Sequence, residues 1–288
     1  VGSEMCIRDS YQTANLIFKH VLTLAPADDF VKQKYAISLI RTGDLEEAQV
    51  LLNGIFNNSK QKNSKVGLVL AGVHASLGNT EKSRTVYKKI LKHDSKNSEA
   101  CIFLGKSYAL EKKTSKAIKL LKSCERKDKG NGIYSYYIGK IYVDKKKYSQ
   151  AKKYFKRSHR VQKDFSQSIM ALGLIHEELG HYAKAKKVYK KYLKTKPQDK
   201  LILSRLVQLM FTREDFKEVI EYAERLSDYE PDNLNLKVKL GILYTDVKSY
   251  NKAIRSFKDL LSYAPDNDKI LYYLGAIYQE MQEYELSL

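Results

Sequence analysis

Residues 234–267 read LNLKVKLGILYTDVKSYNKAIRSFKDLLSYAPDN, and residues 166–199 read SQSIMALGLIHEELGHYAKAKKVYKKYLKTKPQD. Written one beneath the other, the two segments place the same residue classes at the same positions. Each has a hydrophobic residue followed by Gly, then an Ala, then an aromatic ring four residues later: Leu240-Gly241, Ala253 and Phe257 against Leu172-Gly173, Ala185 and Tyr189. The segment 132–165 repeats the pattern, so the chain has an internal period of 34 residues, which is typical of stacked repeats.

Proline marks the end of three of these segments, at Pro197, Pro231 and Pro265. Proline disfavours the helix interior, so each one separates two helices. The chain of 288 residues has four Pro and fourteen Gly in all. So few helix-breaking residues predict an all-α chain in which each unit is a helix, a turn, a second helix and a stop.

The pattern L-G-x2-Y, then A-x3-F, then P, at this spacing resembles the tetratricopeptide repeat. The resemblance implies an α-solenoid, a right-handed superhelix of helix-turn-helix units. We place a partial unit at 11–28 and another at 268–288, with a continuous array between them. The full units are 29–62, 64–97, 98–131, 132–165, 166–199, 200–233 and 234–267.

The two ends of the sequence do not complete a unit. Residues 1–10 are similar to a peptide translated from sequencing-adaptor DNA, so we expect a non-native or disordered leader there. Because the repeat register already runs at Tyr11 and is interrupted at Leu288, we expect a fragment of a longer array.

Small residues are expected where paired helices approach most closely. These are a Gly on the first helix of a unit and an Ala on the second, since a larger side chain would overpack the contact. Another set of glycines should end the first helices. The first-helix glycines are Gly105, Gly139, Gly173, Gly241 and Gly275, and the turn glycines are Gly43, Gly78 and Gly180.

The net charge of +19 is concentrated in the middle of the chain. Residues 132–199 carry seventeen Lys and Arg against five Asp and Glu. A basic patch on second helices, which face the convex side in this family, comprises Lys152, Lys153, Lys156, Arg157, Lys186, Lys187, Lys190 and Lys191. We favour a solvated face over an acidic protein partner, and both over binding of nucleic acid or anionic lipid.

Three motifs suggest chemistry but fit structural roles better. His176 and His181 are five residues apart with Gly180 between them, so they do not form the zinc box whose histidines share a helix face. Gly105-Lys106-Ser107 lacks the first glycine of a phosphate loop. Cys101 and Cys124 fall at core positions, so we expect buried free thiols rather than a redox pair, and cysteine usage favours a reducing compartment.

The resemblance implies a non-catalytic scaffold that holds a peptide or protein segment in a concave groove formed by first helices. Carried over repeat by repeat, the groove positions are Ile102, Lys106, Tyr136, Tyr137, Lys140, Met170, Arg205, Gln208, Phe211, Lys239, Tyr272 and Tyr273. The Lys and Asn pair that clamps a terminal carboxylate in chaperone-binding members is not found at the matching positions.

Two alternative functions stay open. One is a basic convex surface that binds nucleic acid or an anionic membrane, and the other is a regulatory arm of an enzyme with a catalytic domain elsewhere. No cofactor, metal or small-molecule substrate is expected. No apolar run reaches the length of a membrane span, so we expect a cytoplasmic protein or one peripheral to the cell envelope, with secretion or anchoring by a preceding segment open.

Overall fold

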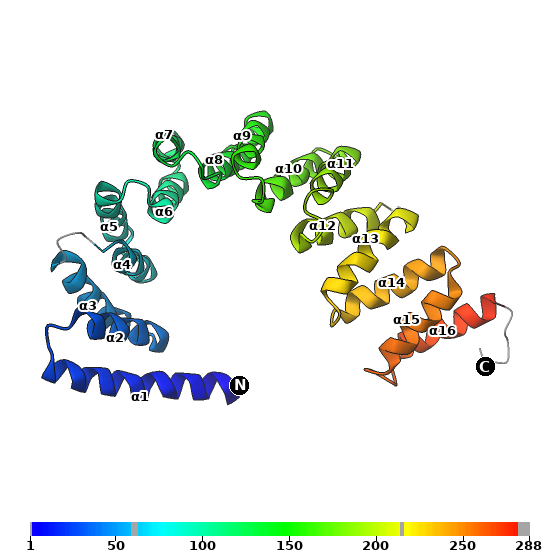
Figure 1. Cartoon of the computed structure of the whole chain (residues 1–288), viewed down its shortest axis with the longest axis horizontal. Coiled ribbons are helices and arrows are strands. Elements are labelled where there is room, and N and C mark those ends of the chain that lie inside the picture. Colours follow the sequence, from blue (N-terminus) through cyan, green and yellow to red (C-terminus); the bar gives the residue numbers. More distant parts are fainter. Residues whose placement is uncertain (1, 59–62, 214–215, 282–288) are drawn as a thin grey trace. The chain divides into compact units, whose positions relative to one another are not determined.

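The computed structural model describes residues 2–58, 63–213 and 216–281, with side chains from residue 9 onward. These residues form sixteen α-helices and no strand (Figure 1). The helices are α1 (Gly2–Leu24), α2 (Asp29–Thr42), α3 (Leu45–Asn58), α4 (Ser64–Ser76), α5 (Thr80–His93), α6 (Ser98–Leu110), α7 (Thr114–Lys127), α8 (Ile133–Asp144), α9 (Tyr148–Val161), α10 (Ser166–Glu178), α11 (Tyr182–Leu193), α12 (Lys200–Phe211), α13 (Phe216–Tyr229), α14 (Leu234–Asp246), α15 (Tyr250–Leu261) and α16 (Asp268–Glu280).

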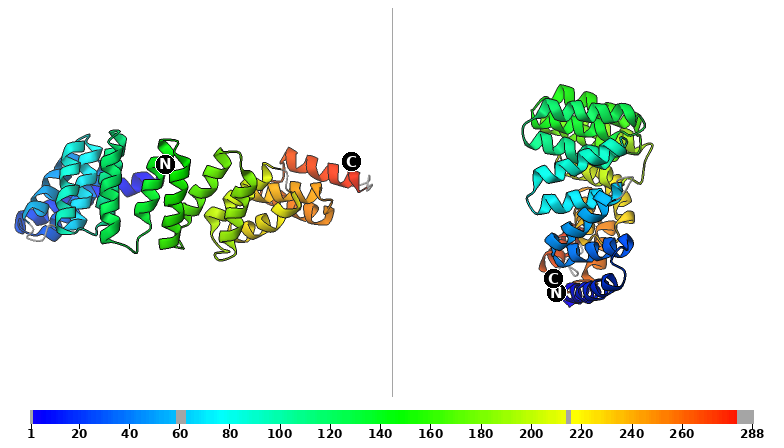
Figure 2. Two further views of the ribbon diagram at one scale, coloured as in Figure 1. Left: turned by 90° about the horizontal axis from the view of Figure 1, so that it is seen from above. Right: turned by 90° about the vertical axis from the view of Figure 1, so that its left-hand side faces the viewer.

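The helices belong to two compact units, Val1–Val161 and Gln162–Leu288. Within each unit, each helix packs against the next one, and the two helices of a repeat run antiparallel (Figure 2). The chain is thus an all-α solenoid of helical repeats. The predicted continuity of the array from the first unit into the second stays a prediction.

Polar side chains cap the starts of the first helices. The carboxylate or amide oxygen of the residue before the helix accepts hydrogen bonds from backbone N–H groups in the first turn, which have no partner inside the helix. The capping residues are Asp28, Asn63, Asn97, Asp199, Asn233 and Asn267. Most of them fall at the same place in the repeat, so the sequence period sets the helix starts directly.

In six repeats, the turn between the two helices contains one residue in the left-handed backbone region. Gly43, Gly78 and Gly180 have φ angles of 96°, 76° and 71°, as expected for glycines that end a helix. In three other repeats the same place is held by Lys112, Lys146 and Lys248, with φ angles of 60°, 55° and 58°. This conformation costs an L-residue with a side chain about 1–2 kcal/mol, so these three turns are strained.

The predicted close approach between paired helices is confirmed. A methyl group added to Gly139 would lie 2.6 Å from the ring of Phe155. The same addition to Gly241 would lie 2.6 Å from Phe257, and an addition to Gly173 would meet Tyr189 at 2.0 Å. The alanines expected on the second helices, among them Ala151, Ala185 and Ala253, are fully buried.

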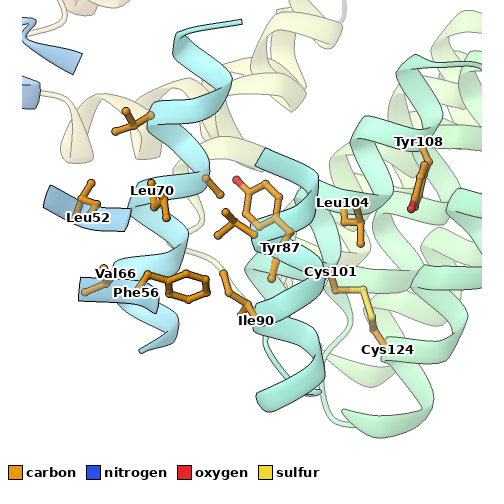
Figure 3. Close-up of a cluster of buried hydrophobic side chains, with 14 of the residues drawn as sticks. Leu52, Phe56, Val66, Leu70, Tyr87, Ile90, Cys101, Leu104, Tyr108 and Cys124 are labelled. Carbon is orange, nitrogen blue, oxygen red and sulfur yellow. A yellow bond between two sulfur atoms is a disulfide. The ribbon is translucent and has the colours of Figure 1, made fainter. Parts of the chain in front are cut away.

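The hydrophobic core of the first unit runs without interruption from one repeat into the next. Figure 3 shows this cluster, in which Leu52 and Phe56 of α3 lie beside Val66 and Leu70 of α4. The cluster continues through Ile90 of α5 into α6 and α7. A single hairpin could not bury its apolar side alone, so neighbouring repeats stabilise one another.

The prediction of free thiols at Cys101 and Cys124 is wrong. The two residues form a disulfide bond between α6 and α7, with their Cα atoms 6.6 Å apart (Figure 3). Both are buried in the core. Core positions on the two helices of one hairpin face each other across the contact, which brings the two sulfur atoms within bonding distance.

The expectation of a disordered leader also needs correction. Residues 2–10 belong to α1, which begins at Gly2 and continues to Leu24. α1 packs against α2. None of the helices in the described ranges is both long and apolar enough to span a bilayer.

We predict that Gly139→Ala destabilises the protein by about 1–3 kcal/mol, because the new methyl group overlaps the buried ring of Phe155. Gly72→Ala is the matched control. Gly72 also lies inside a first helix, but nothing lies within 4 Å of an added methyl group, so this change should stabilise by up to about 1 kcal/mol. Chemical denaturation measures both, and equal effects would contradict the close-approach account.

The disulfide closes a loop of 23 residues, so replacing both cysteines with alanine should cost roughly 3 kcal/mol. A reducing agent should shift the unfolding midpoint of the wild-type protein toward that of the double variant. It should leave the variant itself unchanged. If the two proteins unfold alike under oxidising conditions, the bond does not contribute as proposed.

Candidate functional site

The first helices of consecutive repeats form the inner face of each unit. α6 packs on α8 in the first unit, and α10 packs on α12 and α14 on α16 in the second (Figure 1). Because the second helices cover the other side, side chains that point away from the paired helix are presented on this inner face. The predicted groove residues lie on these first helices.

A pocket of about 270 Å³ lies between α6 and α8 on this face. Its apolar lining includes Leu110, Leu121 and Tyr137, and its charged lining residues are Lys106, Lys140 and Asp144. The structure therefore brings three of the predicted groove residues together: Lys106, Tyr137 and Lys140. We call the pocket lined by Lys106, Leu110, Leu121, Tyr137 and Lys140 the inner pocket of unit 1.

The two lysine side chains of this pocket lie against aromatic rings. The Lys106 ammonium is 5.3 Å from the ring centre of Phe103 and 5.8 Å from that of Tyr137. The Lys140 ammonium lies 5.9 Å from Tyr137 and 6.0 Å from Tyr136. Such contacts orient a cation while leaving its N–H groups available to a ligand. Burial raises the pKa of Tyr136, so this ring stays neutral.

A second pocket, of about 290 Å³, lies on the inner face of unit 2. Gln208 and Phe211 of α12 and Lys239 of α14 line it, and all three were predicted groove residues. The Lys239 ammonium is 5.6 Å from the ring centre of Phe211. Glu230 also lines this pocket, which makes its charge less positive than that of the inner pocket of unit 1.

Arg205 and Met170 are engaged inside the second unit. The Arg205 guanidinium donates to both carboxylate oxygens of Glu177, at 3.2 and 2.5 Å. The buried Tyr189 hydroxyl donates to Glu177 at 2.7 Å and lies 3.9 Å from the Met170 sulfur. Burial, together with the hydrogen bond to Glu177, raises the pKa of Tyr189. This network joins α10, α11 and α12, so Arg205 has a structural partner.

The other predicted groove residues differ in exposure. Ile102 is buried and belongs to the core, so it offers little surface to a partner. Tyr273 stacks on Phe257 with ring centres 5.2 Å apart, whereas Tyr272 is 73% exposed.

Sequence reasoning missed Phe103 and Leu110. Leu110 is 85% exposed and lines the inner pocket of unit 1. Phe103 is also exposed and stacks on Tyr87. Large apolar residues between the motif positions of a first helix are the signal that could have identified them.

Three members of the predicted basic patch are paired with carboxylates. Arg157 contacts Glu125 at 3.0 Å. Lys186 contacts Glu218 at 2.9 Å, and Lys190 forms a second ion pair with the same carboxylate. Lys153 and Lys156 on α9 and Lys187 and Lys191 on α11 are exposed, and Lys152 is half-buried. The pairs reduce the positive charge that these helices present.

The motifs that suggested chemistry occupy structural positions. Gly105-Lys106-Ser107 lies inside α6, so these residues form no phosphate-binding loop. The rings of His176 and His181 are 6.2 Å apart and inclined at 49°.

Antiparallel helix pairs with a continuous core and an inner face of first helices define a helical-repeat solenoid. Residues 135–164 and 166–209 each match a family model described as tetratricopeptide repeat. Together with the fold, these matches support a tetratricopeptide repeat protein. Proteins of this family generally act as non-catalytic scaffolds that bind proteins or peptides.

Two solved structures share the fold. The crystal structure of yeast Tom70 is 18% identical with a TM-score of 0.59; the match covers 96% of this chain and 60% of that one. The C-terminal part of a TPR repeat-containing protein from Cytophaga hutchinsonii is 18% identical with a TM-score of 0.54, and the match covers 84% of this chain and 98% of that one. No curated protein matches the sequence.

The ion pairs of Glu218 predict a pH-dependent stability. The hydrogen bond from Lys190, followed by the one from Lys186, lowers the pKa of Glu218. A lowered carboxylate pKa stabilises the folded state above the unfolded-state pKa, and this contribution disappears as the pH falls through the folded-state pKa.

We therefore expect Glu218→Gln to cost less than about 1 kcal/mol at neutral pH, since the pair is partly exposed. The difference from the wild-type protein should vanish in acid. Glu221→Gln is the control on the same helix, because no ion pair engages the exposed Glu221 within the described ranges. Urea unfolding at several pH values measures these differences, and a constant difference would contradict the assignment.

Proposed function

We propose that this chain is a protein-binding adaptor that holds an extended or helical peptide segment on the inner face of its first unit. The inner pocket of unit 1 supports this proposal. It offers an apolar volume of about 270 Å³ beside two ammonium groups. No carboxylate of the described residues lies within 4 Å of either ammonium group. An apolar side chain of the partner would fill the volume, and an acidic neighbour would pair with the lysines.

The charge pattern favours an acidic partner segment. Lys106 and Lys140 flank Tyr137 on adjacent repeats, and Asp144 contributes one negative charge to the lining. Complementary charge steers association and selects among partners more than it raises affinity. The second unit's pocket, with Gln208, Phe211 and Lys239, would contact a further part of the same or another segment.

A charge reversal tests the proposed binding site. Peptides that combine an apolar residue with neighbouring glutamates are screened against the full chain, and the affinity of those that bind is measured by fluorescence anisotropy. Lys106→Glu with Lys140→Glu should weaken binding at least about tenfold, equivalent to roughly 1.4 kcal/mol. Circular dichroism should show unchanged helicity, because both side chains are exposed.

Lys153→Glu with Lys156→Glu is the matched control, since it makes the same charge change at exposed positions of α9 in the same unit. Binding should survive it. Equal losses in both double variants would instead support a basic outer surface, and binding that survives the inner-face variant would reject the proposed groove.

A further inference from the structure

A third pocket, which is polar, lies between the second helices α3 and α5, away from the inner face. Its volume is about 360 Å³. Gln49 and Asn53 of α3, His74 of α4, and Lys82 and Lys89 of α5 all line it. The residues come from three helices of two consecutive repeats, so the pocket is built by their stacking.

Two buried polar atoms of this pocket have no hydrogen-bond partner among the residues that the structure describes. His74 is 3% exposed, and no hydrogen bond engages its Nδ1 atom. The buried Oε1 atom of Gln49 likewise has no partner. Buried polar groups without hydrogen bonds cost folding free energy, so a ligand that accepts a hydrogen bond from a protonated His74 Nδ1 would bind favourably. The Gln49 oxygen only accepts hydrogen bonds and would need a donor.

The charge of the pocket is positive. Among the described residues, no carboxylate forms an ion pair with Lys82 or Lys89. Glu81, which also lines the pocket, is held by Arg84 at 2.7 Å. Burial, followed by the nearby charge of Lys82, lowers the pKa of His74. The pocket therefore combines two lysines with neutral donors and acceptors.

An equivalent place five repeats further along the chain contains a carboxylate. There the Tyr244 hydroxyl donates to Glu224 at 2.7 Å, and Lys252 donates to the same oxygen at 2.9 Å. Glu224 on one second helix is thus bound by a first-helix side chain and by a lysine of the next second helix.

In the repeat register, His74 takes the place of Tyr244, Lys82 takes that of Lys252, and Asn53 takes that of Glu224. The pocket keeps the lysine but has an amide where the repeat 200–233 supplies Glu224. The remaining full repeats have a lysine at this place: Lys88, Lys122, Lys156, Lys190 and Lys258. At another junction, Lys190 takes the place of Glu224 and Glu218 takes that of Lys252. This ion pair therefore has the acid and the lysine exchanged. The α3–α5 junction therefore differs from these two junctions, because neither of its two places holds an acidic residue.

We propose that the pocket between α3 and α5 binds a carboxylate group supplied from outside the chain, as a small dicarboxylate or as an acidic side chain of a bound protein. The carboxylate takes the place that Glu224 occupies in its own repeat. It accepts hydrogen bonds from the Lys82 ammonium and from the Asn53 amide, and it faces the His74 ring. This site is independent of the proposed peptide groove.

The test follows the imidazole signals of the full chain by NMR during pH titration. An added negative charge favours the protonated ring, so glutarate should raise the pKa of His74 and leave the other five histidines unchanged. Sodium chloride at the same ionic strength should not reproduce the shift. A capped peptide with one glutamate provides the second source, and a shift with this peptide alone assigns the site to protein-borne acids.

Two variants of Asn53 sharpen the experiment. Asn53→Glu introduces the carboxylate that Glu224 supplies in its own repeat, so it should raise the pKa of His74 without ligand and abolish the response to glutarate. Asn53→Gln keeps a neutral amide and should retain that response. The proposal is overturned if neither glutarate nor the peptide shifts His74, if inorganic phosphate shifts it in their place, or if Asn53→Glu leaves its pKa unchanged.

Discussion

The contact between a first-helix glycine and a large side chain of the second helix, found for α6, α8, α10 and α14, sets the geometry on which the rest depends. Phe155 lies where a side chain on Gly139 would be, and Phe257 has the same relation to Gly241. Because glycine faces the partner helix, the next residue is rotated by about 100° away from it. Lys106 and Lys140 directly follow such glycines, and both are exposed on the inner face. One packing constraint therefore both spaces the helices and presents the cations of the candidate site.

The fold could be predicted because each determinant is local and repeated. A period of 34 residues, an Asn or Asp before the first helices and a Gly after several of them are all visible in the sequence. The disulfide could not be predicted in this way. Cys101 and Cys124 were correctly placed in the core, but periodicity gives no distance between two side chains on different helices. The helix over residues 2–10 was missed because the similarity of residues 1–10 to a peptide translated from adaptor DNA was interpreted as absence of structure.

The candidate site was only partly predictable, for a related reason. Repeat positions indicate which side chains point toward the inner face, and they identified Lys106, Tyr137 and Lys140. They do not indicate which of these side chains a neighbouring repeat engages. Arg205 pairs with Glu177, which lies 28 residues earlier in the chain, and the ion pair depends on how two repeats stack. Polar networks between repeats therefore require coordinates, whereas the facing direction of a residue does not.

The hairpin of α6 and α7 joins two features that act against each other. Its turn contains Lys112 in a left-handed conformation, which destabilises the hairpin by about 1–2 kcal/mol. The bond between Cys101 and Cys124 holds the same two helices together. This hairpin also supplies Lys106, Leu110 and Leu121 to the inner pocket of unit 1. The thiol–disulfide state of the surroundings thus acts on the rigidity of the proposed binding surface, and an oxidised chain would meet the proposed ligand with less conformational entropy to lose.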